Sequence, residues 1–281
     1  MNWPAHAKDA PRGDSKTAVV LTWVLPGAGH LYLGMPVFGL AAFVLVQGLY
    51  WLGLQLSHGM LFEYLEPDLH SPVAGVLTPE VGNLGALVYH MQTYGYGLAF
   101  QRPWPDLMWL GCWLTGLSGI LNACLMVQAH SDARAPKSQS SSGNFGKIGR
   151  EVFATWLVPG LGHWLQGRRL RAVVFFVLLV GMLLLGTWLA EGSNLSRERH
   201  FYYWAGQFLA GLPGFVLELF CGRGSVTHDI AYADAGLDLA CLAGLLNVLA
   251  MMDTYAFGEQ RALAPPKLAP LQPVAPSASV P

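Results

Sequence analysis

The chain has 281 residues, of which 53% are apolar and only 12% are charged, and its formal net charge is -1. An ordinary soluble domain has roughly a quarter of its residues charged, so this composition indicates a membrane protein. The near-zero charge, without a basic stripe carrying interleaved aromatic residues, excludes nucleic acid as a partner.

The first expected element follows a polar tail over residues 1–16. It contains the string Thr22-Trp23-Val24-Leu25-Pro26-Gly27-Ala28-Gly29-His30, in which the proline blocks helix continuation and the glycines permit positive φ. We therefore expect a tight turn that ends in an imidazole. No small-residue cleavage pattern follows, so the tail is predicted to stay attached and cytoplasmic.

Two long apolar runs follow in the first half of the chain, Val37 to Leu56 and Leu107 to Val127. Each has about 20 residues, the length that a helix needs to cross about 30 Å of hydrocarbon. Between them lies a middle segment of uncertain depth, Leu84 to Phe100, which carries polar residues and glycines. The preceding segment, His58 to Val81, has several prolines and acidic residues including Glu80, and is expected to form a small acidic cap.

The next segment, residues 131–149, is rich in Ser, Ala, Lys and Gly and predicts a flexible linker. After it the opening string returns as Thr155-Trp156-Leu157-Val158-Pro159-Gly160-Leu161-Gly162-His163, at a constant offset of 133 residues. Two more apolar runs follow, Ala172 to Ala190 and Leu237 to Phe257, with a second middle segment of uncertain depth, Phe201 to Phe220.

The chain is therefore predicted to be an all-α integral membrane protein made of a pseudo-symmetric tandem repeat. Repeat 1 covers residues 17–130 and repeat 2 covers residues 150–260. Each repeat has one Pro-Gly-x-Gly-His segment, two strong spans and one uncertain middle helix. Residues 261–281, rich in Pro and Ala, are expected to form a disordered tail.

The Pro-Gly-x-Gly-His segment is difficult to place as a span. Glu151 to Leu165 is only about 22 Å long as a helix and is interrupted by a proline, so a re-entrant or surface-lying hairpin is expected. Basic residues flank both of its ends, and the positive-inside rule places both groups on one side. With four spans the repeats share one orientation and both termini are cytoplasmic. Of the 16 Lys and Arg residues, only Arg102, Arg197, Arg199 and Arg223 then lie outside. Eight spans also fit the charges, and the shortness of the motif segment favours four.

His30 and His163 are the candidate ligand residues of the motif. They either meet across a pseudo-two-fold axis and bind a metal, a haem iron or an anionic head group, or each hydrogen-bonds a carbonyl group freed by the Pro-Gly break and locks the turn. Supporting metal ligands at helical spacing are missing, which favours the second interpretation, and no cofactor is implied. The other motif residues singled out are Pro26, Gly27, Gly29, Pro159, Gly160 and Gly162.

Three polar residues lie within the predicted spans, namely Asn122, Asn247 and Asp253. An amide that faces hydrocarbon is costly, so the asparagines are expected to clasp neighbouring helices or to line a pathway. Asp253 aligns with Gln128, which argues against a duplicated proton relay. A basic group beside the third span is expected to face anionic lipid or to set the topology. It comprises Arg168, Arg169 and Arg171.

The repeated motif resembles an uncharacterised bacterial membrane family. The form Trp-x-x-Pro-Gly-x-Gly-His, followed by a glycine-rich span that closes with Asn247 and then Asp253-Thr254-Tyr255, is similar to the domain-of-unknown-function 6677 family. More distantly, His30-Leu31-Tyr32-Leu33-Gly34 is similar to the glycine turn of the two-transmembrane-helix domain. The resemblance implies a helical fold in the bacterial inner membrane and supplies no activity.

Three functions remain open. The first is a non-enzymatic inner-membrane bundle that scaffolds partners or binds lipid, with membrane lipids, a membrane-protein partner or a second copy of the chain as its partners. The second is a small transporter or channel with its pathway at the repeat interface. The third is a haem or metal protein ligated by the two motif histidines. No Gly-x-Ser-x-Gly, His-Glu-x-x-His or Walker string occurs, so no catalytic residue is assigned.

Overall fold

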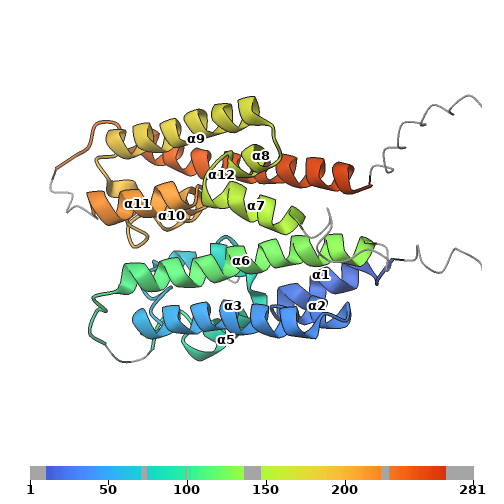
Figure 1. Ribbon diagram of the computed structural model, residues 1–281. Coiled ribbons are helices and arrows are strands. Elements are labelled where there is room, and N and C mark those ends of the chain that lie inside the picture. Colours follow the sequence, from blue (N-terminus) through green and yellow to red (C-terminus); the bar gives the residue numbers. More distant parts are fainter. Residues whose placement is uncertain are drawn as a thin grey trace, which may run out of the picture.

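The computed structural model describes residues 11–70, 75–98, 100, 102–135, 147–222 and 228–263, and its regular elements are helices. Figure 1 shows two halves, one above the other, each built from one repeat. The first half comprises α1 (Ser15–Val24), α2 (Ala28–Tyr32), α3 (Pro36–Leu56), η2 (Pro67–Leu69), η3 (Pro79–Gly82), α5 (Leu84–Thr93) and α6 (Met108–Arg134). The second comprises α7 (Ile148–Leu157), α8 (Leu161–Leu165), α9 (Arg169–Leu189), η5 (Ser193–Leu195), α10 (Phe201–Phe208), α11 (Leu212–Cys221) and α12 (Ala233–Leu263).

Four helices among the described residues are long and apolar enough to cross a membrane, α3, α6, α9 and α12. These are the four predicted spans, so that prediction is confirmed. In Figure 1, α3 and α9 run in the same direction and α6 and α12 run back, so the two halves share one orientation. The start of α1, the end of α6, the start of α7 and the end of α12 lie at one end of the bundle, which we call the linker end.

Each long pair packs closely because glycines face one another. A Cβ atom on Gly53 of α3 would lie 2.8 Å from the carbonyl oxygen of Gly111 on α6. In the second half, a Cβ atom on Gly186 of α9 would lie 2.7 Å from the carbonyl oxygen of Gly236 on α12. Lipid tails are as apolar as leucine, so helix pairs in a membrane gain from such close backbone contact rather than from burying apolar side chains.

The repeated motif forms a helix, a break and a short helix in both halves. The residues that precede the prolines, Leu25 and Val158, are extended (φ -138° and -137°), as the proline ring requires of its neighbour. The next glycines, Gly27 and Gly160, have φ of 80° and 86°, where a side chain is strained. The chain then folds back, so α2 lies against α1 and α8 lies against α7.

The predicted linker starts too early. α6 continues through Arg134, and residues 131–133 are buried because Ala129 and Ala133 pack on Ala18 of α1. At the other side of the linker, α7 begins at Ile148. The central part of the linker prediction, residues 136–146, lies outside the described residues, as do residues 1–10 and 264–281 of the predicted tails.

The middle segments are short helices and not spans. In the first half η3 and α5 occupy this position, and in the second half α10 and α11 do. α5 packs on α1 of its own half, whereas α10 brings Trp204 and Phe208 against Trp113 of the first half. The main apolar core includes residues from both repeats, among them Trp113, Trp156, Trp204 and Phe208.

Candidate functional site

The asparagines of the spans hold the broken motif helices in place. The Asn122 amide nitrogen donates hydrogen bonds to the carbonyl oxygens of Thr22 and Gly82, both at 2.8 Å. The Asn247 amide nitrogen donates to the carbonyl oxygens of Thr155 and Leu209, at 3.2 and 2.9 Å. Each amide thereby joins its span to the motif helix and to the middle segment of its own repeat.

The proline explains why these amides are needed. In a continuous helix the Thr22 carbonyl would accept the N–H group four residues on, but that residue is Pro26, which has none. Thr155 and Pro159 have the same relation. The expectation that His30 and His163 bind the freed carbonyl groups is wrong, because neither ring nitrogen of His30 has a hydrogen-bond partner among the described residues and the His163 nitrogens face Asp253 and Thr254.

In repeat 2 the motif histidine belongs to a polar cluster. His163 Nε2 lies 2.9 Å from Asp253 Oδ2 and therefore carries the proton, since a carboxylate only accepts. Arg168 Nη2 donates to the same oxygen at 2.5 Å, and Arg171 Nη1 lies 3.3 Å from Asp253 Oδ1. The Arg168 side chain is 12% exposed and is directed inward, so of the two expected roles for the basic group it does not fit lipid contact, whereas Arg171 is 61% exposed. Arg169 lies over the Trp164 ring instead.

Repeat 1 lacks this cluster. His30 is fully buried against Phe38, and neither ring nitrogen has a hydrogen-bond partner among the described residues. Burial lowers the pKa of His30 to about 4, so the imidazole is neutral. Burial also lowers the pKa of His163, against the opposing effect of its bond to Asp253.

The two histidines contact residues of their own repeats, and their helices α2 and α8 lie in different halves (Figure 1). Within the described residues no group of three or more His, Cys, Asp or Glu side chains is arranged to hold a metal ion. Thr254 Oγ1 lies 3.4 Å from His163 Nδ1, so a hydroxyl group, an imidazole and the Asp253 carboxylate follow one another. Enzymes that activate a hydroxyl nucleophile use this arrangement. Thr254 is fully buried, however, and bonds to the Ala250 carbonyl, so a substrate has no access to it.

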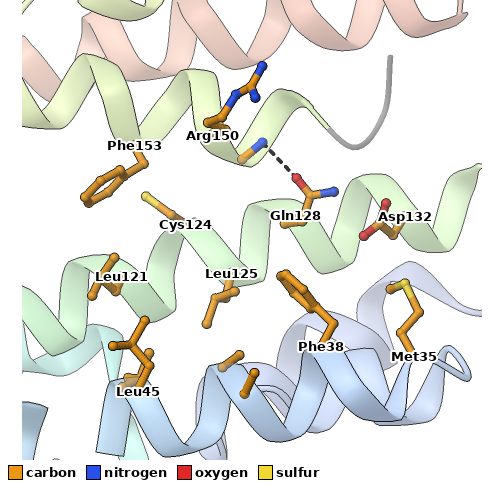
Figure 2. A pocket seen from close by; sticks show the side chains of 14 residues that line it. Met35, Phe38, Leu45, Leu121, Cys124, Leu125, Gln128, Asp132, Arg150 and Phe153 are labelled. Atoms are coloured by element: carbon orange, nitrogen blue, oxygen red, sulfur yellow. Dashed lines mark hydrogen bonds between the residues drawn. The ribbon is translucent and has the colours of Figure 1, made fainter. Parts of the chain in front are cut away.

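A groove of about 460 Å³ opens between the repeats near the linker end. Figure 2 shows side chains from α3, α6 and α7 around it. Its walls are apolar and are lined by Met35, Phe38, Ala41, Ala42, Leu45, Val46, Leu121, Cys124, Leu125 and Phe153. Its other lining residues are Gln128, Asp132, Gly149 and Arg150, and the Gln128 side chain accepts a hydrogen bond from the Gly149 N–H group at 3.0 Å.

The groove occupies the part of repeat 1 that corresponds to the charged cluster of repeat 2. At the aligned positions, the residues that line the groove are smaller than those of repeat 2, or uncharged where repeat 2 has a charge. In repeat 2, Phe175 packs on the imidazole of His163, whereas repeat 1 has Ala42 at the aligned position. The aligned pairs are Met35 and Arg168, Phe38 and Arg171, Ala42 and Phe175, and Gln128 and Asp253.

A buried ion pair joins the repeats outside the groove. Arg197 Nη1 donates to Glu80 Oε1 at 2.7 Å, and Thr115 Oγ1 donates to the same oxygen at 2.9 Å. Burial alone would raise the pKa of Glu80, but the charge of Arg197 and its hydrogen bond hold it below its usual value. The guanidinium lies over three aromatic rings, those of Phe62, Phe201 and Trp204. Glu80 is fully buried, so the expectation that it belongs to a small acidic cap is wrong.

A second buried carboxylate lies at the same interface. Glu218 Oε2 accepts the indole N–H groups of Trp113 in repeat 1, at 2.6 Å, and Trp204 in repeat 2, at 3.1 Å. Sequence reasoning assigned Glu80, Arg197 and Glu218 no role in the contact between the repeats. The available signal was Glu218 itself, a single charge within the apolar helix α11.

The helices and the repeated site define a membrane protein built from two copies of one helical unit. A family model described as a family of unknown function (DUF6677) matches residues 17–141 and 150–266. The chain belongs to this family, and the predicted tandem duplicate is confirmed. No curated protein and no solved structure matches the chain.

Proposed function

We propose that this chain is a non-enzymatic protein of the bacterial inner membrane that holds one lipid molecule in the groove between its repeats. The observation that carries the proposal is the groove itself. Its walls are apolar, polar groups lie at one of its ends, and it is built from two candidate spans and the α7 helix. The wall from Met35 to Val46 is about 16 Å long at 1.5 Å per residue. That length is close to half of a bilayer core of about 30 Å, which suits an acyl chain of a single leaflet.

The surroundings of the groove favour a lipid over a water-soluble ligand. The side chains next to it on α3 are exposed and apolar, including Val37, Leu40 and Val44. A lipid chain therefore reaches the groove sideways from the membrane. In the orientation set by the positive-inside rule, the linker end is cytoplasmic, the motif hairpins re-enter from that side, and the bound lipid belongs to the cytoplasmic leaflet.

The remaining repeat interface supports lipid binding over transport along a central pathway. Large aromatic side chains and the buried pair of Arg197 and Glu80 fill it. A pathway there would require the pair to separate, and separating a buried pair costs about 3–5 kcal/mol. Ligation of one haem iron by both His30 and His163 would require each imidazole to give up its contacts within its own repeat and to meet the other between the halves.

The test fills the groove with the side chain that repeat 2 uses at the same position. Ala42→Phe, which introduces the counterpart of Phe175, and Leu45→Trp at the rim should abolish retention of lipid when the full-length protein is released from mild detergent in native mass spectrometry. Leu45 is 58% exposed, so its variant keeps the core intact. Val37→Phe, on the same helix and 83% exposed, is the matched control and should retain lipid as the natural protein does. Equal retention in all four proteins would refute the proposal.

A further inference from the structure

The polar end of the groove has one group whose bonding is incomplete. Asp132 on α6 is 3% exposed, and its Oδ1 atom has no hydrogen-bond partner among the described residues. The carboxylate is in contact with Gln128, and the charge of Arg12 also acts on it. A buried acceptor without a donor is costly, so a donor is expected where Asp132 meets the groove.

Arg150 supplies the opposite chemistry at the same end. It lies in the first turn of α7, its side chain is exposed, and it pairs with no carboxylate in the part of the chain that the structure describes. Figure 2 shows Asp132 on α6 near the end of the groove where Met35 lies, and Arg150 on α7 above Gln128 with its guanidinium group pointing away from α6. The Arg150 side chain is exposed, so it can turn towards a headgroup at this end of the groove. A guanidinium is well suited to a phosphodiester.

Selectivity has to come from this polar end. The apolar walls offer a lipid chain surroundings no more favourable than the neighbouring lipid tails, so they select for shape and not for headgroup. A headgroup with a phosphate and a charged hydrogen-bond donor would complement Arg150 and Asp132 together. Hydrogen bonds to an ionised group are about twice as strong as those between neutral groups, and an ammonium group adds its own positive charge beside the carboxylate.

We infer that the groove selects a phospholipid with a primary ammonium headgroup, of the phosphatidylethanolamine type, with its phosphate at Arg150 and its ammonium group at Asp132. This inference rests on the proposed lipid site. It requires the headgroup nitrogen to carry N–H bonds, and phosphatidylcholine has the same phosphate and a positive nitrogen without them.

The experiment uses the full-length natural protein in detergent with phospholipids of identical acyl chains. The headgroups are ethanolamine, its N-methyl, N,N-dimethyl and choline forms, and glycerol. Native mass spectrometry should show occupancy that falls as N–H bonds are removed, with ethanolamine about tenfold above choline. Because this series needs no substitution, it does not depend on the folding of any variant.

Two variants separate the roles of the two residues. Asp132→Asn should weaken ethanolamine more than choline and so remove most of the difference between them, whereas Arg150→Gln should weaken both lipids by the same factor. Equal occupancy for ethanolamine and choline, or glycerol binding as well as ethanolamine, would overturn the inference about the headgroup. If no phospholipid is retained, or if Ala42→Phe leaves retention unchanged, the lipid site itself is refuted.

Discussion

Replacing Asn122 by leucine removes both hydrogen bonds by which α6 holds the broken motif helix. The Thr22 carbonyl, which has no N–H partner from Pro26, and the Gly82 carbonyl each lose a donor at 2.8 Å. Interhelical hydrogen bonds within membrane proteins contribute about 0.6 kcal/mol on average and up to about 1.7. Two of them therefore amount to about 1–3 kcal/mol, and the melting temperature should fall by about 3–10 °C for a chain of this size.

Thermal unfolding in detergent, followed by circular dichroism, measures this effect. Ser118→Ala on the same helix is the control, because the Ser118 hydroxyl, among the described residues, bonds the Thr115 carbonyl of its own helix, at 2.7 Å. Asn247→Leu should cost somewhat less than Asn122→Leu, since its bond to Thr155 is longer, at 3.2 Å. If Asn122→Leu lowers the melting temperature no more than Ser118→Ala does, the amide does not replace the missing proline donor.

Three further predictions concern the motif turn, pH and the repeat interface. Gly27→Ala should prevent folding, because its Cβ atom would lie 2.0 Å from a backbone oxygen, and the measurement is loss of the monodisperse peak in size-exclusion chromatography. Gly34→Ala is the control: its Cβ atom has nothing within 4 Å, so only the strain of a positive φ remains, about 1–2 kcal/mol of folding stability. Lowering the pH from 6.5 to 4 should destabilise the protein. The pKa of His30 is about 4 in the folded protein and 6.5 in the unfolded chain, so the unfolded chain takes up a proton first. The stabilising contribution of the neutral imidazole is therefore present above pH 6.5 and is lost as the pH falls. That difference corresponds to about 3 kcal/mol, and a melting profile against pH that is as steep in His30→Gln would contradict it. Arg197→Gln should cost about 3–5 kcal/mol by leaving Glu80 buried and unpaired, and adding Glu80→Gln should recover part of the loss in the same melting assay.

Much of the architecture could be read from the sequence. Four apolar runs of about 20 residues match the four long helices, since the length of a helix that crosses a bilayer is fixed by the thickness of the hydrocarbon. The offset of 133 residues predicts two halves, and two spans in each half predict that they share one orientation. The motif Pro26-Gly27 predicts a break, and the structure has that break with Gly27 at a φ of 80°.

The partners of individual polar groups could not be read in the same way. His30 and His163 occupy identical motif positions, yet only His163 has a carboxylate beside it, because Asp253 of α12 aligns with Gln128 of α6. The carbonyl group freed by the proline is bound by an asparagine far along the chain, on the last long helix of the same repeat. Both outcomes depend on which helix face packs against the hairpin, and a repeat pattern carries no information about that.

Two helical membrane repeats, the place where each repeat breaks, and the family of the chain all follow from the sequence, because span length, proline chemistry and internal similarity are local or periodic properties. Where the repeats meet follows only from their packing in three dimensions. The contact of α7 with α6 leaves the groove beside Ala42, and the closure of the two halves joins Arg197 to Glu80, residues far apart in the chain. Such contacts arise from the fit of two surfaces, and similar repeats can differ there through a few side chains.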